Sequence, residues 1–363
     1  MVVNDNEMNG AWLDRQDVLL HIGVHKTGTT AIQASLAAAR SQLRRNGVTY
    51  PGRRVSHYLA SLAALETRRG WAKGGQMVPA EQWDRLVEDV WSTSDKVVVS
   101  SEAICQATEQ QARRIVDDLA PERVRVLITL RPLESLLPSN WQQYVKTGLS
   151  MRYEQWLEEV MEGPGRSSSP TPSFWTRNDH VALIERWSGI VGAERTCAFF
   201  VDDSDRSGLF RGFDHLIGLP EGTLQPDPHA VSNRSLSASE VEVIRQLNEV
   251  AAEVIDFDIY NRLLRQGGIL DLVENRRPPP DERRLHTPSW AVQRAREHGR
   301  FALTKILASG CHVMGATESY VPDGPIDEAP TPPEPDLVAA DIAVRLLFGV
   351  LHKAVEHRDQ SAT

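Results

Sequence analysis

The sequence predicts a three-layer α/β protein. A central parallel sheet of about five strands is flanked by helices, and a mostly helical C-terminal part follows. Short apolar runs alternate with segments whose apolar residues recur at helical spacing, up to about residue 218. After that point the helical patterns dominate. The chain has 363 residues, 41% hydrophobic and 25% charged, which is an ordinary globular mix and enough for a large core.

Each expected element has its own pattern. Strands are expected at 18–22, 96–100, 124–130 and 196–201, with a short extended piece at 48–52. Helices are expected from Thr29 to about Leu43 and at 108–119, 133–147, 178–191, 238–256 and 288–309. Ser237 and Glu240 have the spacing of a capping box at the start of the helix from 238.

Changes in composition divide the chain into five segments. They are a polar, flexible N-terminus at 1–16, the α/β core at 17–218, a helical extension at 219–321, a Pro-rich acidic linker at 322–336 and a C-terminal helix at 337–363. The last helix has an apolar stripe of Leu337, Val344, Leu347, Phe348, Leu351 and Val355. That stripe is expected to pack on the main body or on a second subunit, so a homodimer is one of two expectations.

Charge and composition exclude several classes of protein. Forty basic against forty-nine acidic side chains give a net charge of -9, which argues against a nucleic-acid partner. The N-terminus lacks the pattern of a secretory signal, and no apolar run is long enough to span a membrane. Three widely spaced cysteines indicate no disulfide framework. We therefore expect a cytoplasmic protein.

The first candidate site is the turn between the first strand and its helix. Gly23 and Gly28 have the GxxxxG spacing of a phosphate-binding loop, but Thr29 stands where a nucleotide kinase has lysine, and the lysine lies inside the loop as Lys26. The backbone N–H groups of residues 27–30 would point from the helix start at an anion, and Lys26 would add a positive charge. The alternative is a βα turn that binds no ligand.

The second candidate site begins where the strand at 124–130 ends. Arg131 follows that strand directly, and Ser139 lies eight residues later on the next helix. A guanidinium and a hydroxyl in these places would hold one phosphate from two sides. Taken alone, an arginine at a strand end is more often a partner in a surface salt bridge.

Together the two segments resemble the PAPS-dependent sulfotransferases, specifically the bacterial carbohydrate or small-molecule type. The similarity covers residues 17–60 and 124–146. It implies a P-loop-like fold whose 17–218 core binds the nucleotide and whose 219–321 extension faces the substrate. The donor would be PAPS (3′-phosphoadenosine 5′-phosphosulfate) and the product PAP, with no metal required. The acceptor would be a hydroxyl or amine of a small molecule, sugar or glycolipid.

The resemblance also implies roles for residues. The run HKTGTT is similar to the family's KxGTT loop, which binds the 5′-phosphosulfate, so this contact falls to His25, Lys26, Thr27, Gly28, Thr29 and Thr30. Arg131 and Ser139 correspond to the pair that binds the 3′-phosphate. The late RKGxxGDWK loop of the hormone-type enzymes is missing, which leaves the adenosine side open.

Three further positions carry predictions with alternatives. His57 and Glu102 are candidates for the base that removes the acceptor's proton, with His57 favoured and Glu102 orienting the acceptor or substituting for it. Each has a structural alternative: a solvated loop histidine and a glutamate at a helix start. The segment Asn233, Arg234 and Ser235 is either a polar lid over the nucleotide or a cap for the following helix.

Two other functions stay open at this stage. One is a small-molecule kinase that uses ATP-Mg, for which Asp202 and Asp203 at a strand end would hold magnesium; exposed acids without a ligand are the more common reading. The other is a non-catalytic nucleotide-binding relative. Both would use the loop around Lys26.

Overall fold

The computed structural model describes residues 12–68, 76–164, 171–205, 207–227, 234–251, 254–326 and 339–361. Its strands are β1 (Val18–His21), β2 (Val48–Thr49), β3 (Lys96–Ser100), β4 (Val124–Leu130), β5 (Thr196–Phe200) and β6 (His312–Gly315). All of them pair in parallel, in the order β2-β3-β1-β4-β5-β6. The predicted α/β class is confirmed, and the strands expected at 96–100 and 124–130 are correct to the residue.

The first half of the chain supplies helices α1 (Thr29–Ala38), α2 (Arg40–Arg45), α3 (Tyr58–Ala64), α4 (Glu81–Trp91), α5 (Glu109–Asp118), α6 (Leu133–Val145), α7 (Tyr153–Met161), α8 (Ser173–Asn178) and α9 (His180–Val191). The second half supplies α10 (Gly208–Ile217), α11 (Ala238–Ala251), α12 (Phe257–Ile259), α13 (Leu270–Asn275), α14 (Ser289–Ala308) and α15 (Ala340–Ser361). The tighter or wider helical turns are η1 (Glu102–Gln106), η2 (Ala193–Arg195), η3 (Tyr260–Ile269, a π-helix) and η4 (Thr317–Tyr320). Ser237 and Glu240 form the predicted capping box: Glu240 N–H donates to Ser237 Oγ, and Ser237 N–H donates to the Glu240 carboxylate.

The sheet has one strand more than the sequence predicted. β6 lies in the segment 219–321, which was expected to be helical, and pairs with β5 from Cys197↔His312 to Phe200↔Gly315. Only four residues make up this strand, and it follows directly after α14, so its apolar pattern is too short to separate from the end of a helix.

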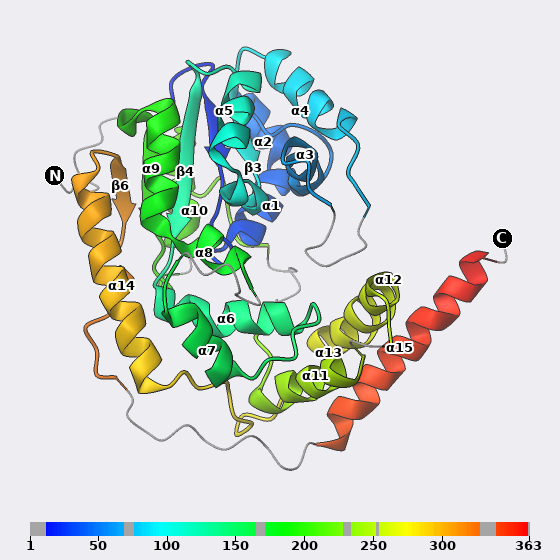
Figure 1. Ribbon diagram of the computed structural model, residues 1–363. Helices are drawn as coiled ribbons and strands as arrows, with labels where there is room; N and C mark the ends of the chain where they lie inside the picture. Colours follow the sequence, from blue (N-terminus) through cyan, green and yellow to red (C-terminus); the bar gives the residue numbers. More distant parts are fainter. Residues whose placement is uncertain are drawn as a thin grey trace.

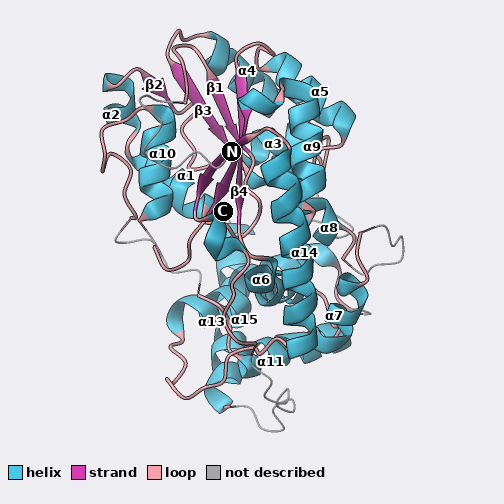
Figure 2. Ribbon diagram, turned by 90° about the vertical axis from the view of Figure 1, so that its left-hand side faces the viewer, coloured by secondary structure: helices cyan, strands magenta, loops and turns pink. Residues whose placement is uncertain are grey.

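Alternating side chains of the strands build two cores. On one face, Leu19, Val98 and Leu127 pack against α1, α2 and α10. On the other face, Leu20, Val99 and Val126 pack against α3, α4, α5, α9 and α14. The period of two that places neighbouring residues on opposite faces explains why these strands are apolar along their whole length. The sheet between its helices is seen from two directions in Figures 1 and 2.

A third core lies away from the sheet. It joins α6, α7, α8 and α11 to η3, α13, α14 and α15 through Leu137, Trp156 and other buried residues. In Figure 1 the helices α6, α7, α11, α13 and α15 lie below the sheet, on the side where the loop after β4 leads. This part of the molecule therefore faces the carboxyl ends of the strands, where ligands bind in open α/β folds.

The C-terminal helix α15 packs on the rest of the protein with one face and exposes the other to solvent. Ile342 and Leu346 of α15 are buried, and Gly349 lies against Gly267 of η3 so closely that a Cβ on Gly349 would meet a backbone oxygen at 2.7 Å. The stripe residues Val344, Leu347, Phe348, Leu351 and Val355 are exposed, whereas Leu337 lies outside the described residues. The homodimer stays a prediction. None of the helices in the described ranges is long and apolar enough to cross a bilayer.

Candidate functional site

The loop between β1 and α1 has the backbone of an anion-binding turn. Gly23 and Gly28 have φ angles of 81° and 87°, and Lys26 between them also has a positive φ, of 68°. A side chain other than glycine rarely adopts this left-handed conformation, and where it does the strain is commonly held at a functional site. The turn is therefore held in a conformation that ordinary βα connections do not need.

Close contacts, as well as the positive φ angles, favour glycine at positions 23 and 28, because a Cβ atom would not fit there. A Cβ on Gly23 would lie 2.9 Å from Cβ of Glu102, and one on Gly28 would lie 2.6 Å from Cδ2 of Leu209. Real Cβ atoms do not approach other carbons this closely. Glycine at these positions lets Glu102 come to the start of the loop and Leu209 to its end.

The N–H groups of residues 27–30 point at no protein acceptor. Within the described part of the chain, none of these four amides donates a hydrogen bond to backbone or side chain. The amides of the next two residues, Ala31 and Ile32, both donate to the carbonyl of Gly28, so α1 closes normally after them. The unpaired amides and the positive end of the helix dipole make this turn suited to a phosphate or sulfate group.

Lys26 and Arg131, one from each predicted motif, meet at this loop, and their binding of a nucleotide stays a prediction. Nη1 of Arg131 donates to the carbonyl oxygen of Lys26 at 3.0 Å, and Nζ of Lys26 donates to Oε1 of Gln143 at 3.1 Å. Neighbouring protein atoms desolvate the Lys26 ammonium and lower its pKa, while Glu102 acts in the opposite direction. Arg131 also forms an ion pair of 2.5 Å with Asp203. Ser139 lies on α6, and its hydroxyl donates to the carbonyl of Leu136 at 3.1 Å.

The other residues of the loop differ in what they present to a ligand. Thr27 is buried: its hydroxyl donates to the carbonyl of Val24 at 2.7 Å and contacts the Thr129 hydroxyl. Thr29 is also buried, whereas Thr30 is exposed. His25 is half-buried with an unpartnered Nε2, and its pKa is lowered by burial and by the positive charges of Arg177 and Lys26, so the ring is neutral.

His57 does not have a free nitrogen in this structure. Ser100 N–H donates to Nδ1 at 3.0 Å, so Nε2 carries the proton, and it lies 3.1 Å from the Pro51 carbonyl. Burial lowers the pKa of His57 to about 4, since a charged ring would lose its hydration. The histidine is thus neither solvated nor available to accept a proton in this conformation, which differs from both expectations drawn from the sequence.

Glu102 stands where the sequence placed it, directly after β3 and at the first turn of η1. Its Oε2 accepts from Nε2 of Gln33 at 3.1 Å, and Gln33 Nε2 also lies 3.3 Å from Oγ and O of Ser100. One carboxylate oxygen is therefore fixed by α1. This holds the side chain beside the loop rather than in a capping contact with its own helix.

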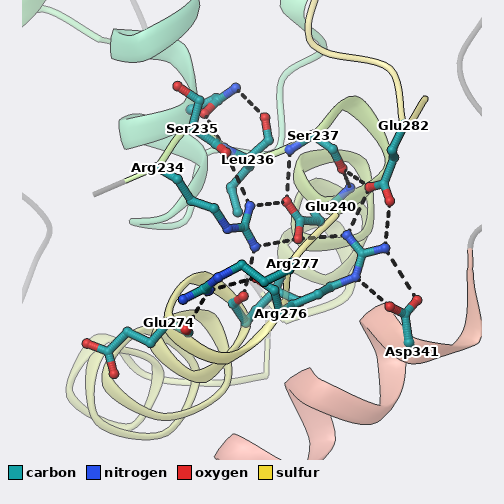
Figure 3. Close-up of polar contacts among 12 residues, drawn as sticks. Arg234, Ser235, Leu236, Ser237, Glu240, Glu274, Arg276, Arg277, Glu282 and Asp341 are labelled. Atoms are coloured by element: carbon teal, nitrogen blue, oxygen red, sulfur yellow. Dashed lines mark hydrogen bonds and ion pairs between the residues drawn. The ribbon is translucent and has the colours of Figure 1, made fainter. Parts of the chain in front are cut away.

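The segment at 234–237 belongs to an ion network that Figure 3 shows. Both Nη atoms of Arg234 bond the Glu240 carboxylate at 2.7 Å, and Nη2 also donates to the Leu272 carbonyl. Ser235 is exposed, and its carbonyl accepts from Arg234. Asn233 lies outside the described residues. In this structure Arg234 connects the start of α11 to α13, and its contact with a nucleotide stays a prediction.

Asp202 and Asp203, the two acids after β5, both have protein partners for their carboxylates. Asp202 accepts hydrogen bonds from the N–H and hydroxyl of Ser204, and Asp203 pairs with Arg131. Both follow β5, which pairs with β4, the strand before Arg131, so Asp203 reaches the site as a partner of Arg131, a role that sequence reasoning missed. Its spacing from the strand end was the only available signal.

A cavity of about 470 Å³ adjoins this arrangement between the ends of β5 and β6 and helix α10. Leu209, which abuts Gly28, is part of its wall, and so is Asp202, next to the Arg131 partner. Phe199 and Phe200 supply aromatic surface, and Met314 and Gly315 of the unexpected strand β6 close the far side. The cavity thus lies near the loop, with Leu209 between it and Gly28, but neither the loop nor the Arg131–Asp203 ion pair lines it.

Comparison with known proteins gives a distant likeness to solved structures. No protein-family model matches the chain, and no curated protein matches it. Among solved structures, a sulfotransferase from Alicyclobacillus acidocaldarius is similar over 65% of this chain and 94% of its own, at 15% sequence identity and a TM-score of 0.42. This likeness is too distant to assign an activity, so we base the functional proposal on the residues around Lys26.

Proposed function

We propose that this chain is a PAPS-dependent sulfotransferase that transfers the sulfuryl group to a small molecule, sugar or glycolipid. One observation carries the proposal: four unpaired amides at residues 27–30 share a loop with Lys26, and Arg131 is hydrogen-bonded to that same loop. Two separate groups of anion-binding donors a short distance apart suit a nucleotide with negative charge at both its 5′ and 3′ positions.

The donor would occupy the loop and the adjoining cavity. The amides of residues 27–30 and Lys26 would hold the 5′-phosphosulfate, and Arg131 with Ser139 the 3′-phosphate. The Ser139 hydroxyl can rotate away from Leu136 to do so, since its present bond is internal to α6. The adenosine would lie in the cavity of about 470 Å³, because Leu209 in its wall lies against Gly28 of the loop and Phe199 and Phe200 offer aromatic surface to a base.

The transfer is an in-line displacement at sulfur. The acceptor's oxygen forms a new bond to sulfur while the bond from sulfur to the bridging phosphate oxygen breaks, so PAP leaves with the electron pair. Negative charge grows on that oxygen and on the sulfuryl oxygens. Lys26 and the fixed amides are in place before the reaction, and preorganised donors of this kind stabilise such charge most effectively.

We propose that Glu102, rather than His57, is the base that removes the acceptor's proton. Both ring nitrogens of His57 are bonded to backbone groups, whereas only one oxygen of Glu102 has a protein partner among the described residues. The carboxylate also lies against the loop, at Gly23. His57 would then support Ser100 and the turn at Pro51, as a positioning residue.

The kinase alternative finds less support in the same residues. Thr29 stands at the kinase lysine position with its hydroxyl directed at the Val24 carbonyl, 3.4 Å away. Asp203, the candidate magnesium ligand, is paired with Arg131. A kinase site would need that carboxylate for a metal ion.

Calorimetric titration and thermal shift test the proposal. PAP without metal should raise the melting temperature, because a ligand present at 100 times its Kd adds about 2.7 kcal/mol to the free energy of unfolding. ATP-Mg should give a smaller shift. Lys26→Gln should weaken PAP binding, and Arg44→Gln, a charge removal on the exposed side of α2, should leave it unchanged. An equal or larger shift with ATP-Mg would refute the assignment.

A further inference from the structure

Three positively charged side chains near Lys26 have no carboxylate partner. They are Lys146, which directly follows α6, Arg177 on α8 and Arg265 on η3, and we call them the basic cluster. Within the described ranges of the chain, none of the three forms an ion pair. Arg177 donates to Oε1 of Gln106 at 3.1 Å and keeps a buried Nε without a partner, and Arg265 has only a weak contact to Asn261 at 3.4 Å.

The fold brings these residues near Lys26, so that their charges and that of Lys26 act on one another. Gln106, which Arg177 contacts, ends the same short helix η1 that Glu102 begins. Gln143, which Lys26 contacts, lies one helical turn before Lys146. Arg177 is thus linked to the helix that Glu102 begins, and Lys146 lies one helical turn from the residue that Lys26 contacts.

Arg265 reaches the same place from another element. Tyr260 at the start of η3 packs on the residue before Lys146, with its hydroxyl 3.4 Å from the Val145 carbonyl and 2.7 Å from Oδ1 of Asn248. Arg265 follows five residues later, which is one turn of a π-helix, so it lies on the same side of η3 as Tyr260. A π-helix is rare and is often found at functional sites.

Three arginines elsewhere in the described chain whose side chains are little exposed are paired with acids. Arg245 pairs with Glu242 and Glu249, Arg276 has three acidic partners, and Arg296 pairs with Glu134. The members of the basic cluster are half-buried and have no such acidic partner among the described residues, and a charge removed from water without a partner is costly. The contrast is sharper because the whole chain has a net charge of -9.

The positive charges also act on one another. The pKa of Lys146 is lowered to about 8, first by burial and then by the charges of Lys26, Arg234 and Arg265, while Glu240 acts in the opposite direction. Arg177 and Arg265 both lower the pKa of Lys26. An anion placed among these groups would relieve that repulsion.

We infer that the basic cluster binds an anionic group of the sulfate acceptor, so that the acceptor is a molecule with a carboxylate, phosphate or sulfate near its reacting hydroxyl. The inference rests on the proposed function, since it takes Glu102 and Lys26 as the reacting side. The donor's charges already have the amides of residues 27–30, Lys26 and Arg131. None of the three cations lines the cavity between β5 and α10, and Arg177 contacts the end of the short helix that Glu102 begins.

Inorganic pyrophosphate is a probe that requires no knowledge of the acceptor. Protein saturated with PAP is titrated with pyrophosphate by calorimetry, and the expected result is binding at a second site. Lys146→Gln and Arg265→Gln should each weaken pyrophosphate binding about tenfold, the loss expected for one charge-assisted contact, and leave the Kd of PAP within about twofold. Arg265→Lys, which keeps the charge, should retain most of the affinity, and Arg44→Gln should behave as wild type.

Three outcomes separate the possibilities. Competition between pyrophosphate and PAP would overturn the inference, because the cations would then belong to the donor site. Equal pyrophosphate binding in wild type and in both glutamine variants would overturn it as well. If PAP fails to bind the wild type, the proposed function falls, and the effect of the variants on pyrophosphate alone then still decides whether the basic cluster binds anions.

Discussion

Replacing Arg276 by methionine should destabilise the folded chain by about 3 kcal/mol, at the low end of the range for removing one partner of a buried ion pair. The Arg276 side chain is 3% exposed and contacts three carboxylates: Glu240 at 2.9 Å, Glu282 at 2.6 Å and Asp341 at 2.7 Å. Glu240 keeps its bonds to Arg234, and the Asp341 side chain is 57% exposed, so the main loss is at Glu282. Figure 3 shows the guanidinium between these groups.

Urea unfolding followed by the fluorescence of the nine tryptophans measures this loss. The matched control is Arg113→Met, which breaks an exposed pair with Glu109 within α5 and should change stability by less than about 0.5 kcal/mol. Hydrogen exchange adds a local readout. Asp341 is in the first turn of α15, so amides of that helix should exchange faster in the Arg276 variant.

The stabilisation that Arg276 provides should depend on pH, and its direction follows from the pKa of Glu282. Arg276 holds the pKa of Glu282 below its ordinary value, so the stabilisation is present at neutral pH and is lost as the pH falls below about 4.3, where the unfolded carboxyl takes up its proton. The difference between wild type and Arg276→Met should therefore shrink toward pH 3. A loss at pH 7 no larger than that of Arg113→Met would refute the account of the network.

Three other predictions concern the site and the assembly. Lys26→Gln should weaken PAP binding about tenfold in calorimetry, since one charge-assisted contact is lost; unchanged affinity would remove Lys26 from the donor site. The pKa of His57 is about 4 in the folded chain and about 6.5 in the unfolded chain, so the unfolded chain binds more protons between these pH values. The free energy of unfolding should therefore fall by up to about 3 kcal/mol as the pH drops from 6.5 to 4. Urea midpoints measured across this range for wild type and His57→Gln test this, and parallel curves for the two proteins would contradict it. If α15 pairs with a second copy, light scattering should find a dimer that Phe348→Asp with Leu351→Asp converts to a monomer, whereas a wild-type monomer would end the dimer hypothesis.

The sequence was sufficient for the parts of the fold that rest on local pattern. The run from Val124 to Leu130 is long, apolar and followed by Arg131 and Pro132, so both its type and its end could be read from the chain. β6 could not, because His312–Gly315 becomes a strand through its pairing with β5. An edge strand of four residues has little pattern of its own, and tertiary contact decides its conformation.

In the candidate site too, features set by neighbouring residues could be predicted from the sequence, whereas contacts between distant segments could not. Gly23, Lys26 and Gly28 share one turn, so their chemistry is visible in ten consecutive residues. Arg177 and Arg265 belong to no motif, and only folding brings them near Lys26. The sequence of His57 and its neighbours likewise contains no sign that Pro51 and Ser100 would occupy both ring nitrogens. Partners distant along the chain determine whether such a residue is reactive.

A chain of buried polar contacts joins the two halves of the proposed reaction centre. The Thr27 hydroxyl contacts that of Thr129 at 2.7 Å, and Thr129 contacts Nε2 of His21 at 3.2 Å. Nδ1 of His21 then contacts the Ser100 hydroxyl at 2.9 Å, and Gln33 links Ser100 to the Glu102 carboxylate.

Burial lowers the pKa of His21 to about 3, so the ring stays neutral and the contacts stay those of uncharged groups. Buried hydrogen bonds of this kind are expensive to leave unmade, which fixes each member relative to the next. The loop that would bind the donor and the carboxylate that would take the acceptor's proton are therefore held by one network through the sheet. Their separation is set by the core of the fold before either substrate binds, which is the condition under which electrostatic stabilisation of a transition state is most effective.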